Sequence, residues 1–375
     1  MTELNDTEKA LFGLAILLVL ITAVFVNSLV CFVVYRNRLL RQQFSSVFIV
    51  NLALCDFLMA LLAMPFSLGA VVVSKWPFGA IMCHLTGFVN QILSISAILT
   101  LATISVDRFY AVIKPLQYRA KMTMQKALRS IVYVWVQAFV FAVVPAVSRW
   151  YVFNEYYCFC TFASFFRTRV ENAFVSCLYL ANFALPLVVM LAAYYKIFKV
   201  ARRHSQRQIA PAVFTLGTFG IVKFEVMRQE IGRLREAKAA RKILIVIAAF
   251  LCCNAPYTLM RMLELTTGRA LATPRAVTIG AKWINFLKSV LNPVIYGLLQ
   301  RRFRAALASV FRWRLRGAEK QWCRTTMSFL HFSPQNGRRT GRPRARSALT
   351  AETTRRPQPK LETRAAVKKF GSLSQ

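Results

Sequence analysis

Charged side chains lie inside long apolar runs at three places in the sequence. Asp56 interrupts the run 44–74, and Lys282 and Lys288 lie in a later run, 277–300. An ionised group within an apolar membrane helix is costly, so such a residue usually has a function and an internal partner. A carboxylate and an ammonium inside one helix bundle can relieve each other. We therefore expect Asp56 and Lys288 to face the interior of a bundle.

A second charged pair lies at the end of a different apolar run. Asp107 and Arg108 close the run 79–106, and Phe109 follows them directly. An arginine at such a boundary can extend its guanidinium into the headgroup layer, which would give it no further role. Because this pair interrupts an otherwise apolar stretch, we prefer a functional role for both residues.

The nine cysteines and three histidines show no spacing typical of a metal site. Nor is there a nucleophile–base arrangement, so the sequence predicts neither an enzyme nor a bound metal or cofactor. Cys83, Cys158 and Cys160 lie at the edges of apolar runs, where the oxidising side of a membrane allows a disulfide. Cys158 and Cys160 are alternative partners for Cys83.

Seven apolar runs account for most of a sequence that is 57% hydrophobic and only 17% charged. Each run meets or approaches the roughly 20 residues that a helix needs to cross a bilayer. Because the backbone must satisfy its own hydrogen bonds in lipid, these runs are expected to be helices. The sequence predicts an all-α membrane protein with a seven-transmembrane helix bundle over 10–300. The runs are 10–35, 44–74, 79–106, 131–148, 172–195, 243–260 and 277–300.

The formal net charge of +36 could indicate nucleic-acid binding, but the basic residues lie between and after the apolar runs rather than on a soluble element. We therefore expect no nucleic-acid partner. Basic loops stay on the cytoplasmic side of a membrane. The loops after the first, third and fifth runs are basic, so we expect residues 1–9 outside the cell and the C-terminus inside. Asn5, in the triplet Asn-Asp-Thr, is then a candidate glycosylation site.

Three further segments follow from composition. Residues 301–316 mix basic and apolar residues at helical spacing, which predicts an amphipathic eighth helix on anionic lipid of the inner leaflet. Residues 317–375 are basic and rich in Pro, Ser and Thr, which predicts a largely disordered cytoplasmic tail. Residues 209–222 are apolar for a loop, and they could lengthen the fifth helix or lie on the membrane.

The motifs resemble those of the rhodopsin-like (class A) G-protein-coupled receptors. Asp107-Arg108-Phe109 resembles the family's Asp-Arg-Tyr, and Asn292-Pro293-Val294-Ile295-Tyr296 matches its seventh-helix motif in full. Trp76-Pro77-Phe78-Gly79 before Cys83 matches its first outer loop. Other landmarks in the expected order are Asn27, Asp56, Trp135, Pro186, Tyr194, Phe250 and Pro256. The resemblance covers the chain from about Ala10 to Phe311.

The resemblance implies a plasma-membrane receptor that activates a heterotrimeric G protein, with arrestin and receptor kinases as further partners. It implies that Arg108 contacts the G protein in the active state and Glu236 in the inactive state. The same switch region includes Asp107, Phe109, Tyr194, Asn292, Pro293 and Tyr296. A buried polar core is implied for Asn27, Asp56, Lys288 and Asn292. The Cys-Phe-Cys pattern resembles an opsin loop that uses its second cysteine, which favours a Cys83–Cys160 disulfide over Cys158.

Several positions depart from the family pattern. Asn90 replaces the aspartate that holds amine ligands, Asn254 replaces a tryptophan before Pro256, and Lys288 replaces an asparagine. These departures are similar to those of a small group of orphan receptors. Lys288 lies one helical turn before Asn292, on the face that the resemblance directs toward Asp56, so we expect an ion pair with Asp56. The alternative is that Lys288 points into a water-filled cavity or outward between helices. The extracellular ligand is not identified, and activity without ligand is an open alternative. The candidate pocket consists of Asn90, Gln91, Asn254, Tyr257, Arg261, Glu264 and Phe286.

Two other classes of membrane protein have to be weighed. An opsin-like light receptor is the alternative function, but Phe286 occupies the position of the retinal-binding lysine, and Lys288 lies about 200° around the helix from it. A transporter or channel would show discontinuous helices and repeat symmetry. The sequence shows neither feature, so a receptor remains the preferred interpretation.

Overall fold

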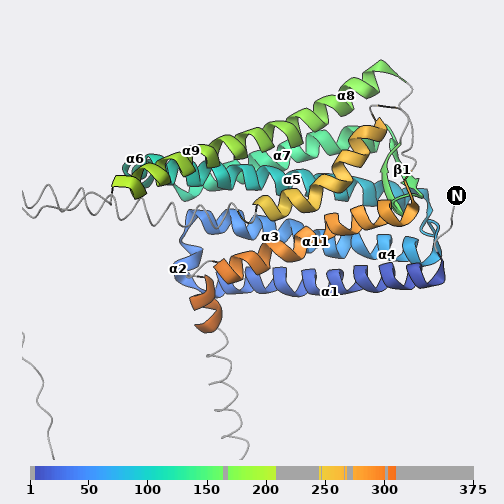
Figure 1. The fold of residues 1–375 in the computed structure, drawn as a ribbon, viewed down its shortest axis with the longest axis horizontal. Helices are drawn as coiled ribbons and strands as arrows, with labels where there is room; N and C mark the ends of the chain where they lie inside the picture. Colours follow the sequence, from blue (N-terminus) through green and yellow to red (C-terminus); the bar gives the residue numbers. More distant parts are fainter. Residues whose placement is uncertain are drawn as a thin grey trace, which may run out of the picture. The chain divides into compact units, whose positions relative to one another are not determined.

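Long helices that run back and forth form a bundle in the computed structural model of the chain (Figure 1). The structure describes residues 5–163, 168–207, 245, 247–265, 267, 273–299 and 303–309. The first four crossings are α1 (Asp6–Arg36), α3 (Phe44–Leu62) with α4 (Met64–Val73), α5 (Gly79–Ile113) and α7 (Met124–Val147). The fifth is α8 (Arg169–Tyr179), the π-helical segment η1 (Leu180–Ala184) and α9 (Leu185–Arg207). The last two are the helical residues 247–265 and α11 (Arg275–Leu299).

The smaller elements lie at the two ends of the bundle. The helices α2 (Arg38–Arg41) and α6 (Pro115–Lys121) follow the first and third crossings. Strands β1 (Tyr151–Asn154) and β2 (Phe159–Phe162) form an antiparallel hairpin in which Tyr151 pairs with Phe162. Residues 303–309 are helical, and Phe303 and Ala306 pack with α1 side chains such as Val30 and Val33.

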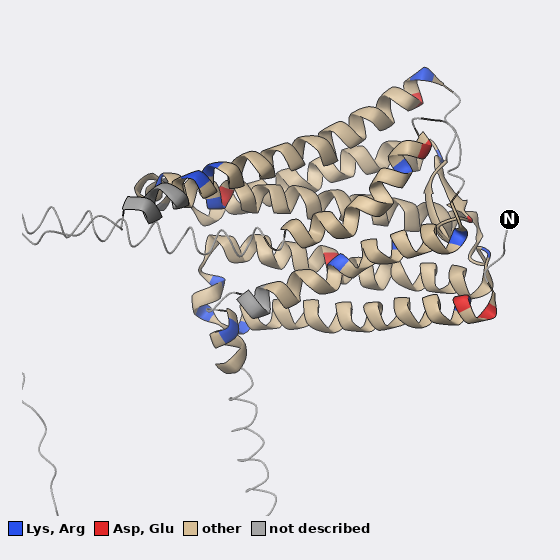
Figure 2. Cartoon of the chain, viewed as in Figure 1, with Lys and Arg blue, Asp and Glu red and all other residues tan. Residues whose placement is uncertain are grey.

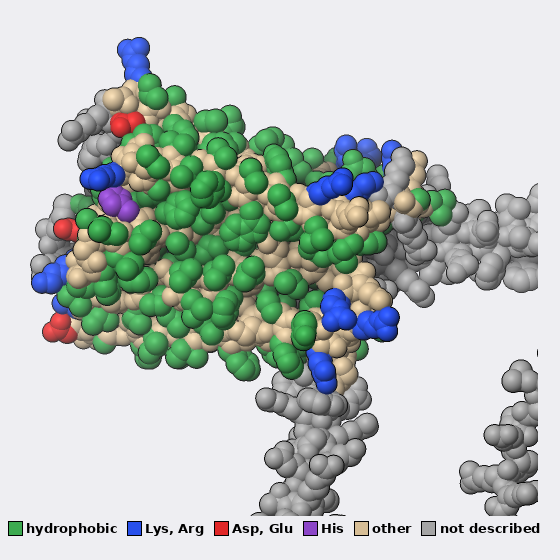
Figure 3. All heavy atoms as spheres, turned by 180° about the vertical axis from the view of Figure 1, so that it is seen from behind, with side chains coloured by type: hydrophobic (Ala, Val, Ile, Leu, Met, Phe, Trp, Pro, Cys, Tyr) green, Lys and Arg blue, Asp and Glu red, His purple; other side chains and the backbone are tan. Residues whose placement is uncertain are grey.

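The bundle has an apolar belt and a basic end. Large apolar side chains face outward along its flank, as Figure 3 shows, and Phe25, Val132 and Phe139 are at least half exposed. Five segments in the described part of the chain are long and apolar enough to cross a membrane. Lysines and arginines gather at the end of the bundle that holds α2 and α6 (Figure 2), which we call the basic end. The opposite end holds the β-hairpin and Asn5, and we call it the hairpin end.

Helix boundaries follow local chemistry rather than the apolar runs alone. α1 begins at Asp6, before the run starts, because Asn5 and Glu8 form a reciprocal capping box and two acidic residues lie in the first turn. The second crossing breaks at Ala63 just before Pro65, which lacks an N–H for the helix. The π-helical segment η1 precedes Pro186 in the fifth crossing, where the backbone donor is missing as well.

Candidate functional site

The centre of the bundle contains a buried carboxylate. Asp56 on α3 is 2% exposed, and its two oxygens accept hydrogen bonds from α11: Oδ1 from Ser289 Oγ at 2.8 Å and Oδ2 from Asn292 Nδ2 at 2.9 Å. The predicted contact with Asn292 is present. Ser289 was not predicted, although it lies three residues before Asn292 and so shares one face of the helix.

The predicted ion pair between Lys288 and Asp56 is not formed. Lys288 is also 2% exposed, but its Nζ donates to Asn254 Oδ1 at 3.0 Å and lies 5.4 Å from the centre of the Phe250 ring. Asn254 is held by a bond from its own Nδ2 to the Phe250 carbonyl oxygen at 2.8 Å. The prediction was wrong because α11 directs the lysine toward residues 247–265, whereas Ser289 and Asn292 already occupy both oxygens of Asp56.

Asn27 compensates for the proline in α11. Pro293 has no N–H to donate to the carbonyl oxygen of Ser289, which lies one turn earlier. Asn27 Nδ2 donates to this oxygen at 2.9 Å and to the Ala23 carbonyl oxygen at 2.8 Å. Asn27 of α1 and Ser289 of α11 therefore connect the two helices next to the Asp56 carboxylate. Through Ser289, Asn27 is linked to Asp56, which also accepts from Asn292.

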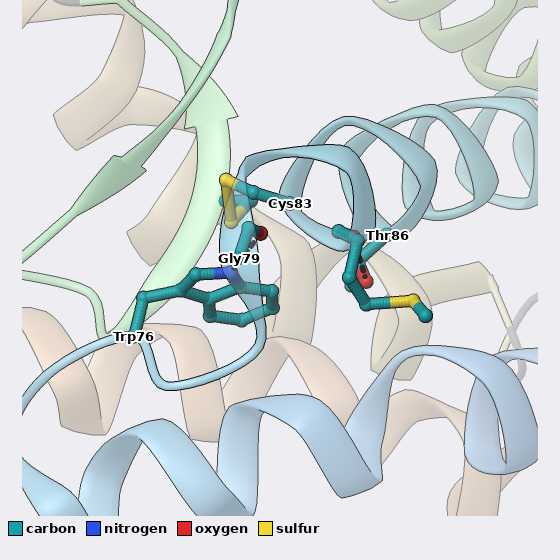
Figure 4. The surroundings of a disulfide bond; sticks show 6 residues. Trp76, Gly79, Cys83 and Thr86 are labelled. Atoms are coloured by element: carbon teal, nitrogen blue, oxygen red, sulfur yellow. Dashed lines mark hydrogen bonds between the residues drawn. A yellow bond between two sulfur atoms is a disulfide. The ribbon is translucent and has the colours of Figure 1, made fainter.

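A disulfide ties the hairpin to the helix bundle. Cys83 near the start of α5 is bonded to Cys160 in β2, and Cys158 remains a buried free thiol. Figure 4 shows the turn that leads into this helix, where Trp76 Nε1 donates to the Gly79 carbonyl oxygen at 2.7 Å. Gly79 has a φ of +77°, a backbone angle that residues other than glycine rarely adopt. The first outer-loop motif therefore shapes the approach to the disulfide.

The hairpin also closes over the sixth crossing. Arg261 and Glu264, both fully buried, form an ion pair, and Arg261 Nη2 donates to the Phe162 carbonyl oxygen at 2.6 Å. Tyr157, in the turn of the hairpin, donates from its hydroxyl to Glu264 Oε1 at 3.0 Å. Burial and the Glu264 carboxylate raise the pKa of Tyr157. The charges of Arg261 and Glu264 are therefore paired with each other inside the protein.

The close approach of the hairpin to α5 depends on Gly87. A Cβ at this position would come within 2.7 Å of ring atoms of Tyr151, which stacks on Phe162 with a centroid distance of 5.2 Å. Any larger residue would push β1 away from α5. This glycine was not singled out in the sequence, because only the tertiary contact reveals the need for it.

A small polar cavity lies between the helices below the hairpin. Its volume is about 100 Å³. The predicted pocket residues that line it are Asn90, Gln91, Asn254 and Tyr257. Asn182, Asn285 and Thr161 also line it and were not predicted. Arg261, Glu264 and Phe286 are buried outside its lining, because the first two pair with each other and Phe286 packs against Phe159 with a centroid distance of 5.9 Å.

At the basic end, Asp107 holds two neighbours. Arg108 Nε donates to Asp107 Oδ2 at 3.0 Å, and the hydroxyl of Tyr118 on α6 donates to Oδ1 at 2.7 Å. Phe109 lies 5.6 Å from Lys196 Nζ, measured to the ring centre. The ring of Tyr194 is buried in the main apolar core. Glu236 and the side chain of Tyr296 lie outside the described residues.

The chain is similar to known receptors over most of its length. Residues 26–296 match the rhodopsin family of 7 transmembrane receptors, and the chain belongs to this family. It is 31% identical to the octopamine receptor beta-1R of Drosophila melanogaster over 78% of this chain and 60% of that protein. It is 30% identical to the human G-protein coupled receptor 26 over 76% of this chain and 85% of that protein.

The fold agrees with this assignment. Squid rhodopsin matches 84% of this chain, with 88% of its own chain covered, a TM-score of 0.69 and 22% sequence identity. The family consists of receptors rather than enzymes, and they signal through heterotrimeric G proteins from the plasma membrane, which they cross several times. The same statements apply to this chain.

Proposed function

We propose that this receptor activates its G protein at a basal level without an added ligand. The observation that carries the proposal is the small size of the cavity below the hairpin. Pockets for small-molecule ligands usually measure about 300–1,000 Å³, whereas this cavity measures about 100 Å³. The charged groups near it have partners within the chain: Arg261 pairs with Glu264, Lys282 donates to Asn90 and Lys288 donates to Asn254.

The switch at the basic end is proposed to control this activity. In the state described here, Arg108 is held by Asp107, which keeps the guanidinium inside the bundle. We infer that Glu236 also holds Arg108 when the receptor is inactive, and that Arg108 is released to contact the G protein in the active state. A partly solvated pair of this kind contributes about 1 kcal/mol, which changes a two-state population several-fold.

The membrane orientation is proposed from charge. The basic end fits the cytoplasmic face and the hairpin end fits the outside, because basic loops are retained inside. Asn5 is then accessible to glycosylation. Anionic lipid would hold the amphipathic segment 301–316, of which the described residues 303–309 are helical. Serines and threonines of the basic tail would be phosphorylated by receptor kinases and would then bind arrestin.

A second-messenger panel on cells that express the full chain tests the proposed activity. With no ligand added, we expect an output above that of cells without the receptor, and no such output from Arg108→Ala at matched surface expression. Glu236→Ala should raise the basal output. An output equal to that of cells without receptor in every pathway would contradict basal activity, and no change for Glu236→Ala would remove this residue from the switch.

A further inference from the structure

Lys282 on α11 lies inside an aromatic cage. The side chain is 2% exposed, and its Nζ lies 4.0 Å from the ring centre of Phe159, 4.5 Å from that of Tyr257 and 4.7 Å from that of Phe286. The same nitrogen donates to Asn90 Oδ1 at 3.2 Å. The rings and the amide come from β2, residues 247–265, α11 and α5, so four segments of the chain meet at one ammonium.

This cage has the composition of a ligand site for a cation. The negative faces of several aromatic rings attract an ammonium, and proteins use such cages to bind cationic ligands. Within the described parts of the chain, no carboxylate forms an ion pair with Lys282, and Glu264 is already bonded to Arg261 and Tyr157. The rings and Asn90 are therefore the groups that contact Lys282 Nζ and that would stabilise its charged form.

The cage adjoins the cavity below the hairpin. Asn90 and Tyr257, which contact Lys282, also line the cavity of about 100 Å³. Removal of the lysine side chain beyond Cβ would join its volume to this cavity. The space created would be surrounded by three rings and one amide oxygen, and a small primary ammonium would fit its chemistry.

We propose that this receptor contains a binding site for an alkylammonium group that is permanently filled by its own Lys282. Lys282 acts as a covalently attached ligand. Its Nζ contacts β2, residues 247–265, α5 and α11 at once, as a bound cation would. The effect on signalling rests on the proposed basal activity, whereas the binding site itself does not.

Chemical rescue tests the site. Lys282→Ala removes the atoms that n-propylammonium would restore, from Cγ to Nζ. In purified full-length receptor in lipid nanodiscs, we expect Lys282→Ala to lower the Tm by about 2 °C for each kcal/mol lost, the lower end of the range for domains of 150–250 residues. Millimolar n-propylammonium chloride should raise the Tm of Lys282→Ala toward the wild-type value, with saturation, and should leave the wild-type Tm unchanged.

Matched controls separate a cation site from simple cavity filling. 1-Propanol has a similar shape without charge, so it should give little rescue at the same concentration. Phe159→Leu in the Lys282→Ala background should weaken the response to n-propylammonium. Equal stabilisation by the alcohol, or equal stabilisation of the wild type by the amine, would overturn the proposal.

A second variant covers the case in which Lys282→Ala does not fold. Lys282→Met keeps an unbranched side chain that is one atom shorter and removes the charge, so it is expected to fold with a lower Tm than the wild type. A Tm equal to the wild-type value would overturn the proposal, because the cage would then stabilise no cation. In cells, n-propylammonium should return the basal second-messenger output of Lys282→Ala toward the wild-type level. Rescue of the Tm without rescue of output would retain the site and contradict only its effect on signalling.

Discussion

The hairpin end and the basic end hold their helices together by different means. At the hairpin end, β2 is bonded covalently to α5 through Cys83–Cys160, and Arg261 reaches from residues 247–265 to the β2 backbone. Arg275 of α11 donates to the carbonyl oxygens of Glu155 at 3.0 Å and Ser74 at 3.2 Å. At the basic end, Asp107 accepts hydrogen bonds from Arg108 beside it and from Tyr118 of α6, which follows α5 in the chain, and Phe109 of α5 lies 5.6 Å from Lys196 Nζ of α9.

The contrast indicates which end of the bundle can move. Connections between distant segments fix the helices at the hairpin end, and rearrangement there would break a covalent bond and several buried contacts. The contacts of Asp107 are local, so they allow neighbouring helices to shift while the pair reforms. We therefore expect the helices to stay in place at the hairpin end and to rearrange at the basic end when the receptor switches.

Loss of the disulfide should give the largest effect. Cys83 and Cys160 are 77 residues apart in the chain, and a cross-link of this span stabilises a fold by about 4.5 kcal/mol. Cys160→Ser should therefore remove most receptor from the cell surface, as measured by flow cytometry with an N-terminal epitope. Cys158→Ser is the matched control and should retain surface expression. The reverse result would show that Cys158 is the bonded residue in cells.

Arg261→Ala should have the next largest effect. The substitution leaves Glu264 buried without its cation and the Phe162 carbonyl oxygen without a donor, at a cost of about 3 kcal/mol. Thermal unfolding of the purified receptor should show a clear fall in Tm, and Arg261→Ala with Glu264→Ala should recover part of it. If the double variant is less stable than the single one, the hairpin is not held by this pair.

Substitutions of Lys288 and Asp56 in the centre of the bundle should lower stability less, and their effects should be nearly additive. Lys288→Met and Asp56→Asn each weaken hydrogen bonds of a charged group, so we expect each to lower the free energy of unfolding by about 2 kcal/mol. Since the two charges are not in direct contact, their coupling in a double-mutant cycle should stay below about 1 kcal/mol. A coupling of several kcal/mol would show that Lys288 and Asp56 form a direct ion pair after all.

Tyr118→Phe should have the smallest effect on stability. It removes one hydrogen bond to Asp107 at the basic end, which contributes about 1 kcal/mol. We expect a Tm close to the wild-type value together with a several-fold rise in basal second-messenger output, because Asp107 restrains Arg108 less firmly. A large fall in Tm without a change in output would mean that the basic end is as rigid as the hairpin end.

The helices were predictable from the sequence, whereas many contacts between them were not. The lengths of the apolar runs show where helices can cross the membrane, so the runs located the crossings. They did not locate every helix end: α5 continues past Asp107 and Arg108 to Ile113, because charged residues at the membrane boundary do not end a helix. Asp56 and Asn292 were expected to meet because both lie at the same depth in a family pattern. The partner of Lys288 depends on the rotation of α11 about its axis, which depth does not determine.

The contacts of the hairpin were hard to predict because they depend on the path of a loop. Arg261 and Glu264 are three residues apart on a helix, so their pairing could have been predicted from spacing alone. Their further contacts with Phe162 and Tyr157 could not, because these residues belong to a loop whose path depends on the disulfide and on close packing against Gly87. The aromatic cage of Lys282 has the same origin, since one of its rings, Phe159, comes from this loop.

The free thiol of Cys158 has a consequence for the biosynthesis of the receptor. It lies two residues from Cys160, so it is a built-in competitor for the disulfide during passage through an oxidising compartment. Thiol–disulfide exchange starts with attack by a thiolate. Burial raises the pKa of the Cys158 thiol, although Arg275 beside it acts in the opposite direction. The thiol is therefore rarely ionised while the hairpin turn is closed, and isomerisation of the bond would require local unfolding of this turn.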